Sequence, residues 1–156
     1  MLSDPKHQER LDRLTIRLRL APAITSDLIA DVVADACTRV QVLHKAGKAA
    51  RIDRLIEAAA WSDVALALIE IELPAWKLRR LIHDDGEWFC SLSQQPDLPV
   101  EFDDTADARH DVLALAILSA FIEARRRTSG AREIGSPTVP QVGLTAATAI
   151  CCDNFA

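Results

Sequence analysis

The stretch W-K-L-R-R-L-I-H-D-D-G-E-W-F-C-S-L-S, from Trp76 to Ser93, decides the fold class of this chain. Two runs rich in apolar residues flank His83-Asp84-Asp85-Gly86, a pattern that is typical of a β-hairpin. Glycine adopts a positive φ without a Cβ clash, and aspartate suits the turn positions before it. Because the rest of the sequence has mainly helical periodicity, a hairpin here predicts an α+β domain rather than a plain helix bundle.

The register of the hairpin determines which residues share a face. We predict a three-residue loop that ends at Gly86. The predicted pairs are His83–Glu87, Ile82–Trp88, Arg80–Cys90 and Leu78–Leu92, and one face then carries Trp76, Leu78, Ile82, Trp88, Cys90 and Leu92. The exceptions are Arg80 on this apolar face and the pair Leu81 and Phe89 on the polar one. A two-residue Asp85-Gly86 turn would shift the pairing by one residue and mix both faces, so we favour the longer loop.

A third strand is expected, because a lone hairpin is only marginally stable in water. Residues 14–20 (L-T-I-R-L-R-L) alternate strictly between apolar and polar, which favours a half-buried strand. A helix is the alternative, since Leu11, Leu14 and Leu18 also fit one helical face.

The remaining apolar residues recur at helical spacing. The predicted helices run from Thr25 or Ser26 to Gly47, from about Lys48 to Ala59, from Ser62 to Pro74, and over about 105–127. We therefore predict an α+β fold with three to four helices packed on a small antiparallel sheet, built on the β-hairpin at 76–93. The domain is expected to span 14–127, between a polar N-terminal segment (1–13) and a largely disordered tail (128–156).

Composition narrows the class of protein. The chain has 156 residues, of which 49% are hydrophobic, 26% charged and 4% aromatic, and its formal net charge is −5. Such a chain can bury a core, and its acidity argues against nucleic acid as a partner. No apolar run reaches the roughly 20 residues that span a membrane. No signal peptide precedes the four cysteines and no cofactor motif occurs, so we expect a cytoplasmic protein without membrane partner or cofactor.

An acidic cluster at the start of the predicted last helix is a candidate metal site. Asp107 and Asp111 lie four residues apart, and His110 lies three residues after Asp107, so all three side chains would share one side of that helix. Two carboxylates and an imidazole are suitable ligands for Mg²⁺, Mn²⁺ or a catalytic Zn²⁺. The alternative is that these residues complement the helix dipole on a solvated turn.

Three further candidates carry weaker signals. The basic junction at 39–54, with Lys48, Arg51 and Arg54 on the predicted second helix, could contact DNA phosphates, or could be a solvated helix junction. Cys90 with His83 could form a nucleophile–base pair, but the predicted register places them on opposite faces. The vicinal Cys151 and Cys152 lie in the predicted tail, where metal binding or a bond to another thiol is an alternative to no role.

Residues 60–93 (A-W-S-D-V-A-L-A-L-I-E-I-E-L-P-A-W-K-L-R-R-L-I-H-D-D-G-E-W-F-C-S-L-S) resemble small uncharacterised proteins of alphaproteobacteria, of rhizobial type. The similarity extends through Pro96-Asp97-Leu98-Pro99 to about Arg127. No function is known for that family of hypothetical proteins, so the resemblance implies only a bacterial cytosolic protein.

Because no catalytic or cofactor motif occurs, the protein is expected to act through a surface that binds another protein. The leading hypothesis is a non-enzymatic regulatory or adaptor domain that acts through protein–protein contacts, with self-association as one form. Leu81 and Phe89, left over on the polar hairpin face, are the predicted contact pair, with Trp76 and Trp88 beside them because tryptophan is enriched in binding hot spots. A metal-dependent enzyme using Asp107, His110 and Asp111 is the alternative, and DNA binding through 39–54 is the third.

Overall fold

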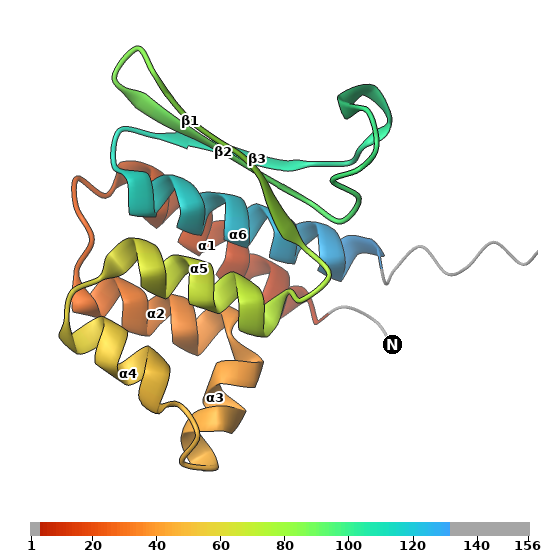
Figure 1. The fold of residues 1–156 in the computed structure, drawn as a ribbon. Coiled ribbons are helices and arrows are strands. Elements are labelled where there is room, and N and C mark those ends of the chain that lie inside the picture. Colours follow the sequence, from red (N-terminus) through yellow and green to blue (C-terminus); the bar gives the residue numbers. More distant parts are fainter. Residues whose placement is uncertain (1–3, 132–156) are drawn as a thin grey trace, which may run out of the picture.

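The computed structural model describes residues 4–131, which form a helical body with one small sheet (Figure 1). The elements in chain order are α1 (Pro5–Leu20), α2 (Ser26–Ala36), α3 (Thr38–Lys45), α4 (Ala50–Glu57), α5 (Trp61–Glu72), β1 (Lys77–Asp84), β2 (Glu87–Ser93), the short 3₁₀ helix η1 (Val100–Phe102), β3 (Ala106–His110) and α6 (Leu113–Ala131). The predicted α+β class is confirmed, with more and shorter helices than predicted.

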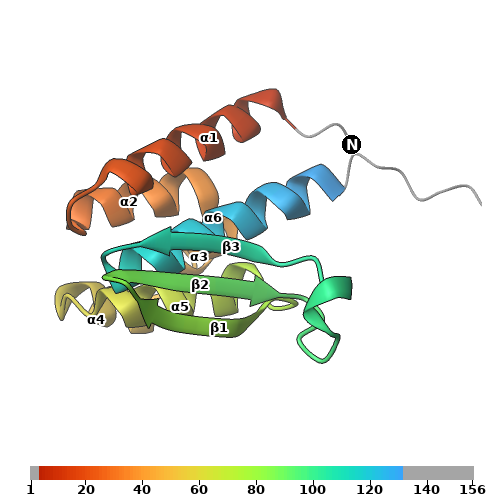
Figure 2. The same ribbon diagram turned by 90° about the horizontal axis from the view of Figure 1, so that it is seen from above.

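The molecule has a sheet layer lying on stacked layers of helices. The three antiparallel strands lie in the order β1-β2-β3, as Figure 2 shows from above. Helix α6 lies directly beneath β2 and β3 and also contacts α1 and α5. Helices α2, α3 and α4 lie farther from the sheet (Figure 1).

Helix α6 is the centre of the core because its middle is apolar on almost every side. Its fully buried side chains include Leu115, Ile117, Leu118, Phe121 and Ile122. Such a helix must be covered all round. The sheet, α1 and α5 supply this cover, so the two ends of the described chain pack together.

The prediction of a strand at 14–20 is wrong, because these residues belong to α1. Leu11, Leu14 and Leu18 are buried, whereas Ile16 is 60% and Leu20 is 75% exposed. The helical alternative had identified the buried face correctly. Helix α1 begins at Pro5 behind an Asp4 cap, so residues 5–13 belong to the same helix rather than to a separate polar segment.

The hairpin exists, but its predicted register is wrong by one residue near the turn. The observed pairs are Asp84–Glu87, His83–Trp88, Ile82–Phe89, Leu81–Cys90, Arg80–Ser91, Leu78–Leu92 and Lys77–Ser93. The turn is the two-residue Asp85-Gly86, in which both residues have positive φ, 50° and 81°. This conformation follows the natural twist of the paired strands.

A β-bulge at Arg79 explains why the predicted register gave the cleaner separation of apolar and polar residues between the two faces. The pairing shifts between Leu78 and Arg80, where one residue of β1 has no partner of its own. A bulge changes the face that the following side chains occupy. It moves Arg80 to the outer face and Leu81 to the inner one, and it restores the predicted Leu78–Leu92 pair. The two-residue turn was rejected because it mixed apolar and polar residues on both faces. The bulge removes this mixing beyond Arg79.

The third strand is 106–110, which was predicted to be the first turn of the last helix. β3 pairs antiparallel with β2, with Trp88 opposite His110 and Leu92 opposite Ala106. Helix α6 begins at Leu113 and includes residues 128–131, while the remainder of the predicted tail lies outside the described residues. The predicted helix from 25 to 47 is also two helices, α2 and α3, which meet at Cys37.

Candidate functional site

The segment between β2 and β3, residues 94–105, lies at one end of the sheet (Figure 1). A buried ion pair fastens it there. The guanidinium of Arg79 donates to the carboxylate of Asp103, and its Nη2 donates to the carbonyl oxygen of Leu98 at 2.7 Å. Ser93 Oγ donates to Asp103 Oδ2 at 2.6 Å. The side chains of Arg79 and Asp103 are only 12% and 3% exposed. This segment is therefore a fixed part of the surface, although it is mostly irregular.

Three apolar side chains of this segment face solvent. Leu98 is 37%, Val100 47% and Phe102 75% exposed, and we name these three residues the apolar loop. None of these three residues was among the candidate site residues predicted from the sequence. The signal available was a phenylalanine, a valine and a leucine placed around Pro96 and Pro99, where solvated loops usually carry polar residues.

The predicted contact residues do not form one surface. Leu81 lies on the inner face opposite Cys90, whereas Phe89 lies on the outer face opposite Ile82, with the guanidinium of Arg109 4.9 Å from its ring centre. Trp76 is buried, and its Nε1 donates to Thr128 Oγ1 at 3.2 Å. Trp88 is half-buried on the inner face, and its ring contacts that of His83 in a tilted arrangement, with 4.7 Å between the ring centres.

The three predicted metal ligands do not form one cluster, because they lie on β3 and the turn after it rather than on a helix: Asp111 reaches His110, but Asp107 is on the opposite face of the strand. Successive residues of a strand point to opposite faces, and accordingly Asp107 is exposed while His110 is buried. No group of three potential metal-ligating side chains occurs within residues 4–131. His110 Nδ1 accepts the backbone N–H of Val112 at 2.9 Å, which fixes the turn into α6. Asp111 Oδ1 lies 2.6 Å from the same nitrogen, and we assign the backbone contact because the Asp111 carboxylate is 71% exposed and free to rotate.

The basic junction is partly neutralised by acidic neighbours. Arg51 pairs with Glu70 of α5 at 3.3 Å, and His44 Nε2 lies 2.8 Å from Asp53. Arg54 Nε donates to the carbonyl oxygen of Ala50 at 3.2 Å, within its own helix. Lys48 lies in the connection between α3 and α4. DNA binding here stays a prediction, with less free positive charge than the sequence suggested.

The cysteines of the described chain are buried thiols. Cys37 and Cys90 are both free, and neither is exposed. Burial raises the pKa of Cys90 to about 12, with a smaller contribution from the charge of Asp107. Burial, and then the charge of Glu72, raises the pKa of Cys37 as well. Cys90 and His83 share the inner face, contrary to the prediction, but a protonated and inaccessible thiol is a poor nucleophile. Cys151 and Cys152 lie outside the described residues.

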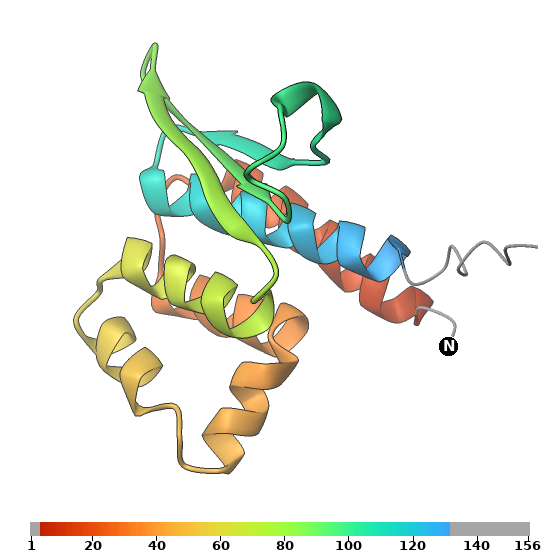
Figure 3. The ribbon, with the colours of Figure 1, turned by 45° about the vertical axis from the view of Figure 1, so that its right-hand side comes forward.

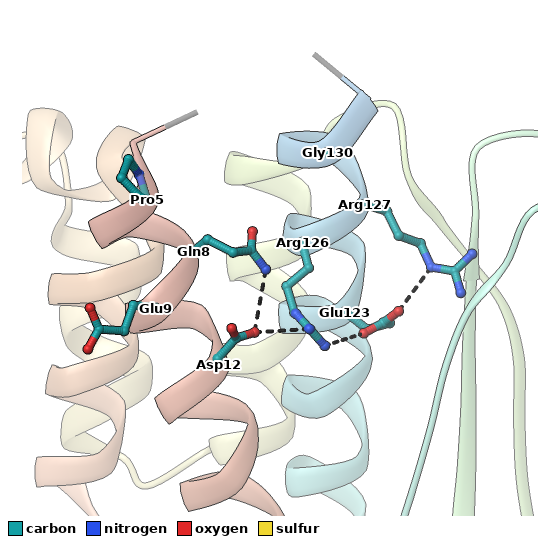
Figure 4. A pocket seen from close by; sticks show the side chains of 8 residues that line it. All are labelled: Pro5, Gln8, Glu9, Asp12, Glu123, Arg126, Arg127 and Gly130. Atoms are coloured by element: carbon teal, nitrogen blue, oxygen red, sulfur yellow. Dashed lines mark hydrogen bonds and ion pairs between the residues drawn. The ribbon is translucent and has the colours of Figure 1, made fainter. Parts of the chain in front are cut away.

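A cleft of about 640 Å³ lies between α1 and α6, and its charged groups satisfy one another (Figure 4). Arg126 contacts Asp12 at 2.9 Å and Glu123 at 3.3 Å, and Arg127 contacts Glu123 at 3.1 Å. Asp12, Arg126 and Glu123 point toward one another, whereas Glu9 points away. These groups connect the two helices, and their pairing leaves little charge to attract a ligand.

Comparison with protein-family models, curated proteins and solved structures gives no match for this chain. Within residues 4–131, no helix is both long and apolar enough to cross a membrane.

Proposed function

We propose that this protein is a non-enzymatic regulatory or adaptor domain that acts through protein–protein contacts. The observation that supports the proposal most is Phe102, an aromatic side chain that is 75% exposed although its loop is fastened to the sheet by a buried ion pair. Phenylalanine is enriched in protein interfaces relative to the rest of the protein surface.

The fastening of the loop favours binding for a thermodynamic reason. A mobile apolar loop loses conformational entropy when it docks, and this loss reduces its affinity. The contacts of Asp103 with Arg79 and Ser93 already hold the loop, so docking has less freedom left to remove. Apolar side chains that are both exposed and fixed are expected at a contact surface.

Self-association is the form of this proposal that is tested first. Light scattering should give a molecular mass that rises with concentration, and the double variant Val100→Ser/Phe102→Ser should reduce that rise. Ile16→Ser is the matched control, because Ile16 is 60% exposed on α1, away from the apolar loop. This control should behave like the unchanged protein.

Binding of a different protein to the apolar loop is tested by crosslinking. A photoreactive phenylalanine analogue at position 102 should form a covalent adduct with the partner, and the same analogue at position 16 should not. A monomer at every concentration, together with no adduct specific to position 102, would contradict the proposal.

A further inference from the structure

A second cavity, of about 540 Å³, lies at the end of the molecule where several segments meet. Figure 3 shows the start of α1, the start of α3, the end of α5 and the end of α6 on this side. Among the residues that line the cavity are His7, Arg39, Glu72, Trp76 and Arg125. Its volume is within the range of small-molecule sites, and it combines opposite charges with an aromatic wall.

Glu72 is the feature of this cavity that points to a ligand. The residue is only 3% exposed, in the last turn of α5. Its Oε1 accepts the backbone N–H of Val40 in the first turn of α3 at 2.8 Å. Its Oε2 is equally buried and has no hydrogen-bond partner within residues 4–131. A buried carboxylate oxygen without a donor is costly, so a donor from a bound molecule would remove a real deficit.

Positively charged groups line the same cavity without closing on Glu72. The Nε of Arg125 is buried and has no partner within the described chain. The Nη1 of Arg39 donates a hydrogen bond to the carbonyl oxygen of Ile71 at 3.3 Å. No ion pair within residues 4–131 joins Glu72 to either arginine. The opposite charges thus lie around one space instead of neutralising each other in direct contact.

We propose that this cavity binds a free amino acid. The ammonium group of the ligand donates to Glu72 Oε2, and its carboxylate accepts from Arg39 and Arg125. Trp76 forms the apolar wall for the ligand side chain, and its indole is fixed by the hydrogen bond to Thr128.

Other ligand classes fit the same groups less well. An inorganic anion such as phosphate would be repelled by Glu72, and a divalent cation would be repelled by Arg39 and Arg125. A molecule with one charge of each sign is attracted by both sets of groups. The neighbouring His7 has a lowered pKa, chiefly through burial and then through the charge of Arg125, so it adds little positive charge at neutral pH.

The test uses the full chain and the twenty common L-amino acids, each added singly at millimolar concentration. At least one of them should raise the melting temperature and give saturable heat in calorimetry. The matching amine without the carboxylate, and the matching acid without the amino group, should bind at least about tenfold more weakly, since each loses one charged contact. No binding by any amino acid, or equal binding by either analogue, overturns the proposal.

Glu72→Gln tests the role of the orphaned oxygen, because its amide oxygen can still accept from Val40. It should weaken binding at least about tenfold, whereas Glu70→Gln, on the exposed side of the same helix, should leave it unchanged. Arg39→Gln is the second variant. Because Arg39 is exposed, this substitution should leave the fold intact, and it therefore tests the site even if Glu72→Gln does not fold. Binding that is insensitive to Arg39→Gln, or that is equally lost in Glu70→Gln, contradicts the assignment.

Discussion

Asp103 is the residue at which a single substitution should damage the loop most. Its carboxylate accepts from Arg79 and from Ser93, and almost none of it is exposed. Asp103→Ala leaves the buried Arg79 guanidinium without its counter-charge, which we expect to lower the free energy of unfolding by about 3–5 kcal/mol. Urea unfolding followed by circular dichroism measures this loss. Asp97→Ala, in the same loop but exposed, should change it by less than about 0.5 kcal/mol.

The two buried thiols predict how stability depends on alkaline pH. The pKa of Cys90 is raised from an ordinary value of 9.0 to about 12. The thiol therefore loses its proton more readily in the unfolded chain than in the folded one. Its contribution to stability is fully present below pH 9.0 and is lost as the pH rises toward about 12.

The measurement is the urea midpoint at increasing pH above 9.0. The midpoint should fall more steeply in the unchanged protein than in Cys37→Ala/Cys90→Ala, and the difference isolates the thiols. The chain contains no tyrosine, so no phenol titrates in the same range. Parallel pH profiles for both proteins would be inconsistent with buried thiols.

At the scale of elements, helix α1 allows a direct test against the strand pattern. In a strand, Leu14 and Ile16 would share a face, and truncating either would cost a similar amount of stability. Of these two side chains, only Leu14 is buried in α1. Leu14→Ala should therefore lower the free energy of unfolding by about 2–5 kcal/mol, whereas Ile16→Ala should change it by less than about 0.5 kcal/mol. Thermal or urea unfolding separates the two outcomes.

The predictability of each element followed the strength of its local signal. The helix start was predicted at Thr25 or Ser26, and the structure selects Thr25 as the cap, since its hydroxyl accepts from the N–H of Leu28 at 3.2 Å. Helix α5 ends just before Pro74, as predicted. Strand β3 was missed because A-D-A-R-H contains none of the strand-favouring residues Val, Ile, Thr, Phe, Tyr and Trp. Its strand conformation comes from pairing with β2, and such tertiary pairing overrides local propensity.

The candidate sites were harder to predict because they depend on contacts between distant segments. Glu72 reads as one charge in the helical run I-E-I-E, and nothing nearby signals that it accepts from Val40, 32 residues away. Arg79 and Asp103 are separated by 24 residues. The metal cluster had the opposite fault, since its spacing was meaningful only on a helix that the structure replaces with β3.

At the scale of the whole molecule, the packing predicts one cooperative unfolding transition. Helices α1 and α6 come from opposite ends of the described chain, and the sheet rests on α6. Trp76 is hydrogen-bonded to Thr128 of α6, and Trp88 lies on the inner face of the sheet. Tryptophan fluorescence and helical circular dichroism should therefore give coincident urea curves. Two separated midpoints would show that the sheet unfolds independently of the helices.

The bulge at Arg79 also bears on how the protein behaves at high concentration. Strand β1 is an edge of the sheet, and an edge strand is a template on which further chains can add to form fibres. Proteins suppress such growth with bulges and with lysine or arginine on the edge, and β1 has both: the bulge at Arg79 and the exposed side chains of Lys77 and Arg80. The same arginine that fastens the apolar loop therefore also protects the sheet from unlimited polymerisation.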